Sequence, residues 1–329
     1  MKKYNIAIVG ATGLVGRTFL KILDEYQFPI NQLTLYASPK SVGKKILFQN
    51  QEYEIKALDE NAFENVDIAL FSAGAKVSKE FAPLAAEKGA YVIDNSSAWR
   101  MDENCALVVP EVNIEDAFTK SAIIANPNCS TIQSVVPLKA LSDQFGIKKI
   151  VYTTYQAVSG SGKKGIDDLE RGLQHLKNEF YPYDISQTCI PEIDEFLDNG
   201  YTKEEMKMIN ETKKILHLDN VPISATCIRV PVKNCHGVVI AVELAKQFTL
   251  DEVRDAFAKQ KGIVLYDDVK KHIYPHSIVA NNQDQIFVGR IREDLANKNG
   301  ILLYCVADNV RKGAASNAIQ IAMALIEKI

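Results

Sequence analysis

Residues 6–16 read Ile6-Ala7-Ile8-Val9-Gly10-Ala11-Thr12-Gly13-Leu14-Val15-Gly16. The first four form a short apolar run typical of a buried strand, and apolar residues then recur at helical spacing from Leu14 to Leu23. The glycines fall at a strand-to-helix junction, where Gly10 permits a tight turn, Gly13 lets backbone approach a pyrophosphate, and Gly16 lets the helix pack on the sheet. The junction predicts a Rossmann-type dinucleotide site, with a purely structural turn as the alternative.

The end of the second predicted strand bears on which dinucleotide binds. Residues 33–37 are apolar or uncharged and lead into Ser38-Pro39-Lys40-Ser41, with no carboxylate at the strand end. An NAD site usually has Asp or Glu there for the ribose hydroxyls, whereas hydroxyls and a cation suit a ribose 2′-phosphate. The segment therefore favours NADP over a plain polar loop. Cofactor contacts are expected from Gly10, Thr12, Gly13, Leu14, Val15, Ser38, Lys40 and Ser41.

Length and composition indicate a two-domain enzyme. A chain of 329 residues that is 47% hydrophobic can form about two cores. Its net charge of −3 provides no basic surface for nucleic acid, and no apolar stretch approaches the roughly 20 residues that span a membrane. The chain enters a strand almost at once, without an apolar signal segment, so a cytoplasmic location is expected.

Six cysteines are widely scattered, at positions 105, 129, 189, 227, 235 and 305. No disulfide framework is expected, and outside Cys129 the preferred interpretation is a small buried hydrophobic residue. No C-x-x-C pair occurs, and the five histidines form no metal-binding motif. The sequence predicts no metal site.

Strands and helices alternate through the first third of the chain. Buried strands are predicted at 66–71, 91–94 and 122–125, with a helix at 77–88. This alternation is typical of a parallel sheet, in which ligands bind at the carboxyl ends of the strands. Two segments are expected at that edge: Ser72-Ala73-Gly74 and Asn95-Ser96-Ser97.

Cys129 is the candidate nucleophile. The strand at 122–125 leads into Asn126-Pro127-Asn128-Cys129, and apolar residues from Ile132 to Leu138 then follow helical spacing. Cys129 is therefore expected at a helix N-terminus, where the helix dipole and free amides stabilise a thiolate and can form an oxyanion hole.

The second half of the chain has a different strand pattern. Segments 149–155, 224–230, 237–244 and 301–306 are too polar and alternating for a second parallel Rossmann sheet, so a mixed α+β layer is expected. An amphipathic helix is predicted near the end of the chain, at 315–326.

In its motifs and their order, the chain resembles the bacterial aspartate-β-semialdehyde dehydrogenase family. Besides the glycine turn, the resemblance rests on Phe71-Ser72-Ala73-Gly74, Pro127-Asn128-Cys129-Ser130-Thr131, Thr154-Tyr155-Gln156-Ala157-Val158-Ser159-Gly160, Glu205-Met206-Lys207, Arg229-Val230-Pro231-Val232 and Asp308-Asn309-Val310-Arg311-Lys312-Gly313-Ala314-Ala315. It implies an α/β protein like glyceraldehyde-3-phosphate dehydrogenase: an N-terminal Rossmann-type NADP-binding domain (1–129 plus 308–329) and a C-terminal α+β mixed-sheet catalytic and dimerisation domain (130–307).

The resemblance also implies an activity. This is the NADP-dependent conversion of L-aspartyl-4-phosphate to L-aspartate 4-semialdehyde and inorganic phosphate, through a thioester on Cys129, in lysine, threonine, methionine and diaminopimelate biosynthesis. A thiolate suits this step because it is strongly nucleophilic near neutral pH and its thioester still accepts hydride. Family members are homodimers, sometimes paired into tetramers.

The resemblance also implies a role for each residue that matches a family motif. His236 matches the general acid/base, Gln156 the residue that orients the substrate, and Arg229 the cation that grips the α-carboxylate. Taken alone, the sequence allows a surface histidine, an end-of-strand polar residue and a surface salt bridge for these positions.

The remaining matched positions concern substrate and cofactor. Arg100 and Lys207 match the phosphate-binding cations, Glu204 can meet the substrate ammonium, and Asn128 adjoins the thiol. On composition alone, the stretch from Glu204 to Lys207 is more typical of a solvated charged helix. Ser72, Ala73, Gly74, Ser159, Gly160 and Asn309 are matched to the cofactor. The run 159–165 lacks the P-loop pattern, and a flexible linker is its other interpretation.

Two rival functions stay open. N-acetyl-γ-glutamyl-phosphate reductase shares the thiol and hydride chemistry, but that family has Pro-Gly-Cys where this chain has Pro127-Asn128-Cys129. A non-catalytic NADP-binding paralogue would lack the thiol, the base or an anion-binding residue, and all three are present here.

Overall fold

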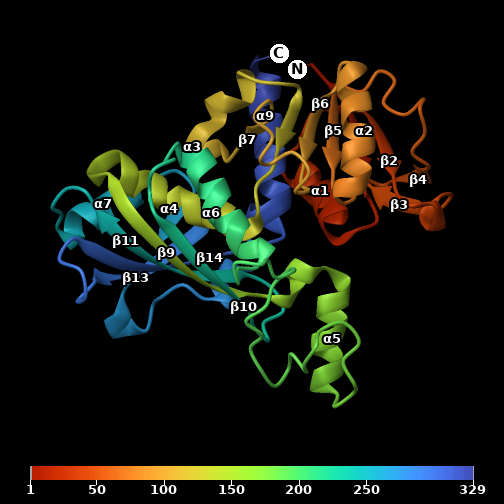
Figure 1. Ribbon diagram of the computed structural model, residues 1–329. Helices are drawn as coiled ribbons and strands as arrows, with labels where there is room; N and C mark the ends of the chain where they lie inside the picture. Colours follow the sequence, from red (N-terminus) through yellow and green to blue (C-terminus); the bar gives the residue numbers. More distant parts are fainter. Residues whose placement is uncertain (1, 329) are drawn as a thin grey trace. The chain divides into compact units, whose positions relative to one another are not determined.

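The computed structural model describes residues 2–328 and divides into two compact units. The first unit contains the chain up to Pro127 together with the C-terminal segment from Ala314, and the second unit is Asn128–Gly313. Figure 1 follows the chain from red to blue and labels the helices and strands. Each unit is built around its own sheet.

The first unit contains an eight-stranded sheet in which every strand pair is parallel except β3–β4. In spatial order the strands are β3 (Lys45–Phe48), β4 (Gln51–Lys56), β2 (Ile30–Tyr36), β1 (Tyr4–Val9), β5 (Ile68–Phe71), β6 (Tyr91–Asp94), β8 (Ile123–Ala125) and β7 (Ala106–Leu107). The predicted parallel sheet is confirmed, whereas β3, β4 and β7 were not foreseen.

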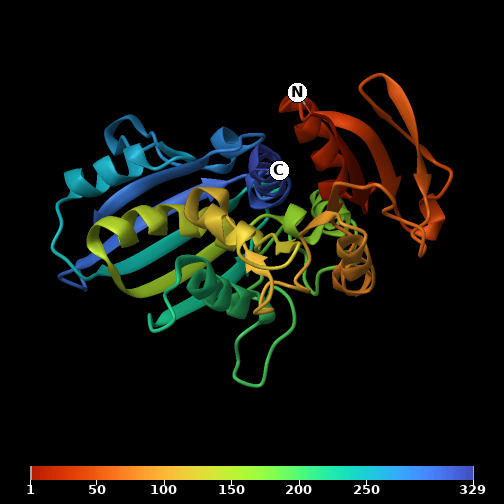
Figure 2. The same cartoon turned by 90° about the horizontal axis from the view of Figure 1, so that it is seen from above.

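Helices cover both faces of this sheet. On one face, Ile6 and Ile8 of β1 share a core with α1 (Leu14–Glu25) and α9 (Ser316–Lys328), while Ala7 and Val9 face a second core that includes α2 (Ala75–Glu87). This alternation follows from the two-residue period of a strand. Figure 2 shows α1 beside the first strands from above. Each fully buried large apolar side chain stabilises the unit by about 1.5–3 kcal/mol.

The junction between β1 and α1 requires glycine for steric reasons. Gly10 has φ +90°, and a Cβ there would lie 2.3 Å from the carbonyl oxygen of Ser72. A Cβ on Gly16 would lie 2.2 Å from the carbonyl oxygen of Gly10. The chain therefore turns sharply and the helix packs directly on the turn, as the sequence predicted.

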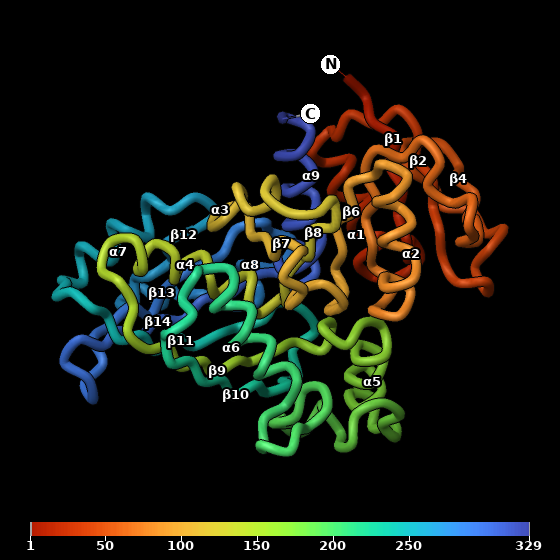
Figure 3. The backbone as a smooth tube through the Cα atoms, turned by 45° about the horizontal axis from the view of Figure 1, so that its top comes forward, coloured from red at the N-terminus to blue at the C-terminus, as the bar shows by residue number. Residues whose placement is uncertain are grey.

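The second unit contains a six-stranded mixed sheet, as expected. In spatial order its strands are β10 (Ile223–Arg229), β9 (Ile147–Gln156), β11 (His236–Leu244), β14 (Gly300–Ala307), β13 (Ile286–Glu293) and β12 (Ile263–Leu265). The outer pairs β10–β9 and β12–β13 are parallel, and the inner pairs are antiparallel. The tube in Figure 3 follows these strands beneath their helices.

Three helices cover one face of the mixed sheet: α4 (Cys129–Phe145), α6 (Lys203–Leu216) and α7 (Leu250–Lys259). On β11, Val238, Ile240 and Val242 are buried toward these helices, while alternate residues are only half-buried. Helix α5 (Lys163–Leu173) packs on a separate small core. The short helices α3 and α8 are Pro110–Asn113 and Ser277–Ala280.

None of the six cysteines, all within residues 2–328, forms a disulfide. The expectation of burial for the five other than Cys129 holds for Cys105, Cys227, Cys235 and Cys305, and is wrong for Cys189, which is exposed on the loop before α6. Within residues 2–328, no helix is long and apolar enough to cross a membrane.

The steric role of Gly10 is testable against Gly89. Both have φ +90°, but a Cβ on Gly89 meets nothing within 4 Å. Gly89→Ala should cost about 1–2 kcal/mol from backbone strain, and Gly10→Ala about 1–3 kcal/mol more from overpacking. Denaturant unfolding followed by fluorescence of Trp99, the single tryptophan, reports on the first unit. Equal losses would show that the Ser72 carbonyl moves aside without cost.

Candidate active site

Three predicted site residues lie at adjacent ends of three neighbouring strands of the mixed sheet. Gln156 and Arg229 are the last residues of β9 and β10 and are paired in the ladder. His236 is the first residue of β11, whose next residue, Gly237, pairs with Tyr155 of β9. Because β11 runs antiparallel to β9, its start adjoins the end of β9.

Cys129 is the first residue of α4, so its predicted place at a helix N-terminus is confirmed. Asn128 is the N-cap, and its Oδ1 accepts hydrogen bonds from the backbone N–H groups of Ser130 (3.0 Å) and Thr131 (3.3 Å). A Cβ on Gly313 would lie 2.9 Å from the Cβ of Cys129. The start of α4 is therefore fixed on one side by its cap and on another by the closing segment.

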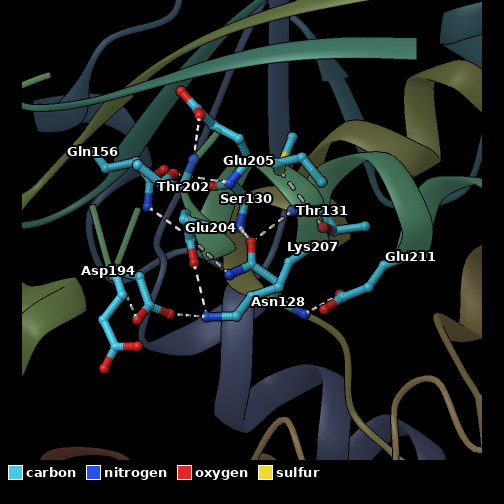
Figure 4. Close-up of polar contacts among 12 residues, drawn as sticks. Asn128, Ser130, Thr131, Gln156, Asp194, Thr202, Glu204, Glu205, Lys207 and Glu211 are labelled. Atoms are coloured by element: carbon cyan, nitrogen blue, oxygen red, sulfur yellow. Dashed lines mark hydrogen bonds and ion pairs between the residues drawn. The ribbon is translucent and has the colours of Figure 1, made fainter. Parts of the chain in front are cut away.

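Two carboxylates of α6 hold Asn128 (Figure 4). The Asn128 side-chain Nδ2 donates to Glu204 Oε1 at 2.8 Å, and its backbone N–H donates to Glu211 Oε2 at 2.6 Å. Glu211 was not predicted. Its signal lay in the sequence, because a residue seven positions after Glu204 occupies the same helix face.

Glu204 is the centre of a polar cluster. It is 5% exposed and also accepts from Gln156 Nε2 at 3.1 Å and from Lys207 Nζ at 3.2 Å. Burial pushes its pKa upward, but the Lys207 charge, the hydrogen bonds from Asn128 and Gln156, and Arg229 outweigh burial, so the pKa lies below its usual value. Glu204 therefore stays ionised, and the solvated-helix interpretation is wrong for this residue.

Lys207 has a second carboxylate partner that the sequence did not reveal. Its Nζ lies 2.7 Å from Asp194 Oδ2, and both side chains are partly exposed. Figure 4 shows Lys207 between Glu204 and Asp194. Asp194 comes from the loop before α6, and nothing in the local pattern of that loop marks it as a partner of the helix.

Arg229 and His236 are both buried, so their surface interpretations are wrong. Arg229 Nη1 donates to the carbonyl oxygen of Ala157 at 2.7 Å, and His236 Nδ1 accepts from the Ala157 backbone N–H at 2.9 Å. Within residues 2–328, Arg229 Nε and His236 Nε2 have no hydrogen-bond partner. Burial first and Arg229 second hold the pKa of His236 well below its usual value.

Gly160 packs directly on these two side chains. A Cβ there would lie 2.8 Å from Arg229 Nη1 and 3.1 Å from His236 Nε2. Its neighbour Ser159 is hydrogen-bonded to Asn309, whose Nδ2 donates to Ser159 Oγ at 2.9 Å. The second unit thus brings Ser159, Gly160 and Asn309 to the Arg229–His236 pair.

The first unit contains a cavity at the glycine turn. Its volume is about 530 Å³, and it is lined by Val9, Gly10, Thr12, Gly13, Ala37, Ser38, Pro39, Ala57, Leu58, Ser72, Ala73, Val77 and Phe81. Six predicted cofactor residues are among them. Leu14 and Val15 instead lie in the first turn of α1, Gly74 is the N-cap of α2, and Lys40 and Ser41 lie in the turn after Ser38. The apolar wall of Leu58, Val77 and Phe81 was not predicted.

Arg100 lies in the first unit and is 8% exposed. Its Nε donates to the carbonyl oxygen of Asn126 at 3.0 Å, and Nη2 donates to that of Asn95 at 2.8 Å. Both of these acceptors belong to the first unit as well. No group of His, Cys, Asp or Glu suited to a metal ion occurs among residues 2–328.

Comparison with known proteins identifies both units. The semialdehyde dehydrogenase NAD binding domain matches residues 5–120, and the semialdehyde dehydrogenase dimerisation domain matches residues 138–312. The aspartate-semialdehyde dehydrogenases of Aquifex aeolicus and Bacillus subtilis are 51% and 44% identical, covering 99% and 98% of this chain and 98% and 97% of their own.

Solved structures of similar proteins point to the same family as the sequence comparisons. Aspartate semialdehyde dehydrogenase II of Vibrio cholerae has a TM-score of 0.95 and 45% identity, with 99% of both chains covered, and a second structure of that enzyme is described as complexed with ASA. The likeness spans both units in sequence and in fold. The chain belongs to the aspartate-semialdehyde dehydrogenase family.

Proposed function

We propose that the protein is an NADP-dependent aspartate-semialdehyde dehydrogenase. It converts L-aspartyl-4-phosphate to L-aspartate 4-semialdehyde and phosphate, a reaction of lysine, threonine, methionine and diaminopimelate biosynthesis. The observation that carries this proposal is a pair of buried, unpartnered nitrogens, Arg229 Nε and His236 Nε2, in the unit that presents Cys129 at a helix N-terminus. An unpaired buried donor costs about 1–3 kcal/mol, so an anionic ligand that pairs with Arg229 is favoured.

The charges suit an amino-acid substrate. Arg229 has the planar fork that binds a carboxylate, and ionised Glu204 can pair with an α-ammonium. Gln156 and Asn128, both hydrogen-bonded to Glu204, orient the substrate beside the thiol. Lys207 and Arg100 are assigned to the phosphate.

Cys129 performs the covalent step. Its sulfur bonds to the acyl carbon, and the carbon–oxygen bond to phosphate breaks with its electron pair on the phosphate. The helix dipole at the N-terminus of α4 stabilises negative charge on the sulfur. When bound, the nicotinamide supplies the hydride that reduces the thioester.

The cavity of the first unit fits the dinucleotide. The N-cap of α1 is Gly13, which provides no side-chain cap, and the first turn of the helix has no acidic residue, so this N-terminus can receive a pyrophosphate. Ser38 lines the cavity at the end of β2, where no carboxylate stands, and Lys40 and Ser41 follow in the same turn. These three residues support NADP.

A homodimer is proposed through the uncovered face of the mixed sheet, with paired dimers as the larger form. The family match to a dimerisation domain covers this sheet. Val151, Val239, Leu302 and Tyr304 point to that face and are only half-buried, which suits a second copy of the chain.

The reductase alternative fits the site less well. Asn128 caps α4 through its side chain and also binds Glu204. The glycine that the N-acetyl-γ-glutamyl-phosphate reductases have at this position could make neither contact. A phosphate-dependent assay of NADP reduction, with L-aspartate semialdehyde and separately with N-acetylglutamate semialdehyde, decides between them. Turnover only with the aspartyl aldehyde is expected, and turnover only with the acetylated aldehyde would overturn the proposal.

Replacing the nucleophile should abolish this turnover. Cys129→Ser is expected to lower kcat by at least about 10³-fold, because a serine hydroxyl is a far weaker nucleophile than a thiolate near neutral pH. Cys189→Ser is the matched control, since Cys189 is exposed, and it should retain full activity. Full activity in Cys129→Ser would rule out the thioester route.

The NADP preference predicts a selective effect at Lys40. Lys40→Ala should raise the KM for NADP by about tenfold, the loss of one charge-assisted hydrogen bond, and should leave any slow reaction with NAD unchanged. Lys44→Ala removes a nearby exposed lysine and serves as the control. An equal effect on both cofactors would contradict a 2′-phosphate contact at Lys40.

A further inference from the structure

Lys207 shares its ammonium between two carboxylates that differ in how firmly they are held. Its Nζ lies 3.2 Å from Glu204 Oε2 and 2.7 Å from Asp194 Oδ2 (Figure 4). The Glu204 side chain is 7% exposed and also accepts hydrogen bonds from Asn128 and Gln156, whereas the Asp194 side chain is 35% exposed. Of the two, Asp194 is the carboxylate that water can solvate when it gives up Lys207.

Asp194 also binds its own loop. Its Oδ1 accepts a hydrogen bond from the backbone N–H of Glu195 at 3.0 Å, and its φ is +69°. Asp and Asn adopt this left-handed conformation with less strain than most other residues. The loop before α6 therefore turns at Asp194, with one carboxylate oxygen bound to the loop and the other to Lys207.

The charges on these carboxylates oppose the binding of a phosphate at Lys207. Burial pushes the pKa of Glu204 and of Asp194 upward, but Lys207 and their other partners outweigh burial, so each pKa lies below its usual value. Both groups are therefore ionised near neutral pH. A phosphate dianion that approaches the ammonium meets two like charges beside it, and like charges repel most strongly at short range.

We propose that Asp194 is a positioning residue that competes with phosphate for the Lys207 ammonium. The inference rests on the proposed function, in which Lys207 binds the phosphate. Before the substrate binds, Asp194 holds Lys207 beside Glu204. The phosphate group of the substrate displaces Asp194 from the ammonium, and Asp194 pairs with Lys207 again when inorganic phosphate leaves.

This exchange involves no covalent step. Only the hydrogen-bond partner of the ammonium changes, and Asp194 keeps its charge throughout. Asp194 lowers the affinity of the site for phosphate, so that inorganic phosphate leaves after the acyl group has been transferred to Cys129. Glu204 does not take part in the exchange, because its contacts with Asn128 and Gln156 hold it in place.

Asp194→Asn tests this competition. The substitution removes the charge, keeps an oxygen that can accept from Lys207, and suits the left-handed backbone. With L-aspartate semialdehyde and NADP as the other substrates, we expect the KM for inorganic phosphate to fall by about 3–10-fold, the effect of one nearby charge in a partly solvated site. We expect kcat and the KM values of the aldehyde and NADP to stay within about twofold of wild type.

Glu195→Gln is the matched control. Glu195 follows Asp194 in the same loop, and its carboxylate pairs with Lys203, so this variant removes one charge from the loop and leaves the Asp194–Lys207 pair in place. Its KM for phosphate should equal that of wild type. An unchanged or higher KM in Asp194→Asn would overturn the proposal. An equal decrease in both variants would also overturn it, because that result reflects the net charge of the loop. Thermal unfolding verifies that each variant is folded.

Phosphate binding can also be measured without turnover. A phosphorus NMR titration of the NADP-bound protein with inorganic phosphate should give a lower Kd for Asp194→Asn than for wild type, by the same factor as the KM. Equal or weaker binding in the variant, or no binding to either protein, would overturn the proposal. If wild type bound phosphate but turned over no aldehyde, the proposed function would fail, and the titration would still decide the role of Asp194.

Discussion

The hydrogen bonds of Asn128 are the constraint on which the rest of the site depends. Its Oδ1 caps α4, its Nδ2 binds Glu204, and its backbone N–H binds Glu211. Because Cys129 is the next residue, these contacts fix the direction in which the thiol leaves the backbone. They also join α4 to α6, so the nucleophile and the carboxylate proposed to bind the substrate ammonium are positioned by one side chain. A smaller residue at 128 would release both.

The contacts of Glu204 show how the free-energy cost of burying a carboxylate is offset. Glu204 is nearly inaccessible, yet its pKa is lowered because Lys207, Asn128 and Gln156 all contact it. Burying an ion costs several kcal/mol unless it is paired and hydrogen-bonded. Arg229 is in the opposite situation, since it has a buried nitrogen without a partner. A site with one satisfied anion and one under-satisfied cation favours a ligand that brings a carboxylate.

The sequence predicted what local patterns determine. The glycine turn, the parallel strands and the place of Cys129 all depend on residues adjacent in the chain, and they were found. Glu211, Asp194 and the Ala157 N–H were missed because each acts through a tertiary contact. The surface interpretations of Arg229 and His236 were wrong for a related reason: a charged or titratable residue at a strand end gives no local sign of whether other elements cover it. Family resemblance supplied these roles, and the structure supplied the burial.

Glycines near the site illustrate the same limit. The run 159–165 has the composition of a flexible linker, but Gly160 and Gly165 are required by lack of space and Gly162 by its backbone conformation. A Cβ on Gly160 would press against Arg229 and His236, and one on Gly165 would lie 2.4 Å from the carbonyl oxygen of Val158. Gly162 is the N-cap of α5 with φ +69°. The segment therefore packs directly against the imidazole of His236 and the guanidinium of Arg229. It can do so because Gly160 has no side chain at the point of contact.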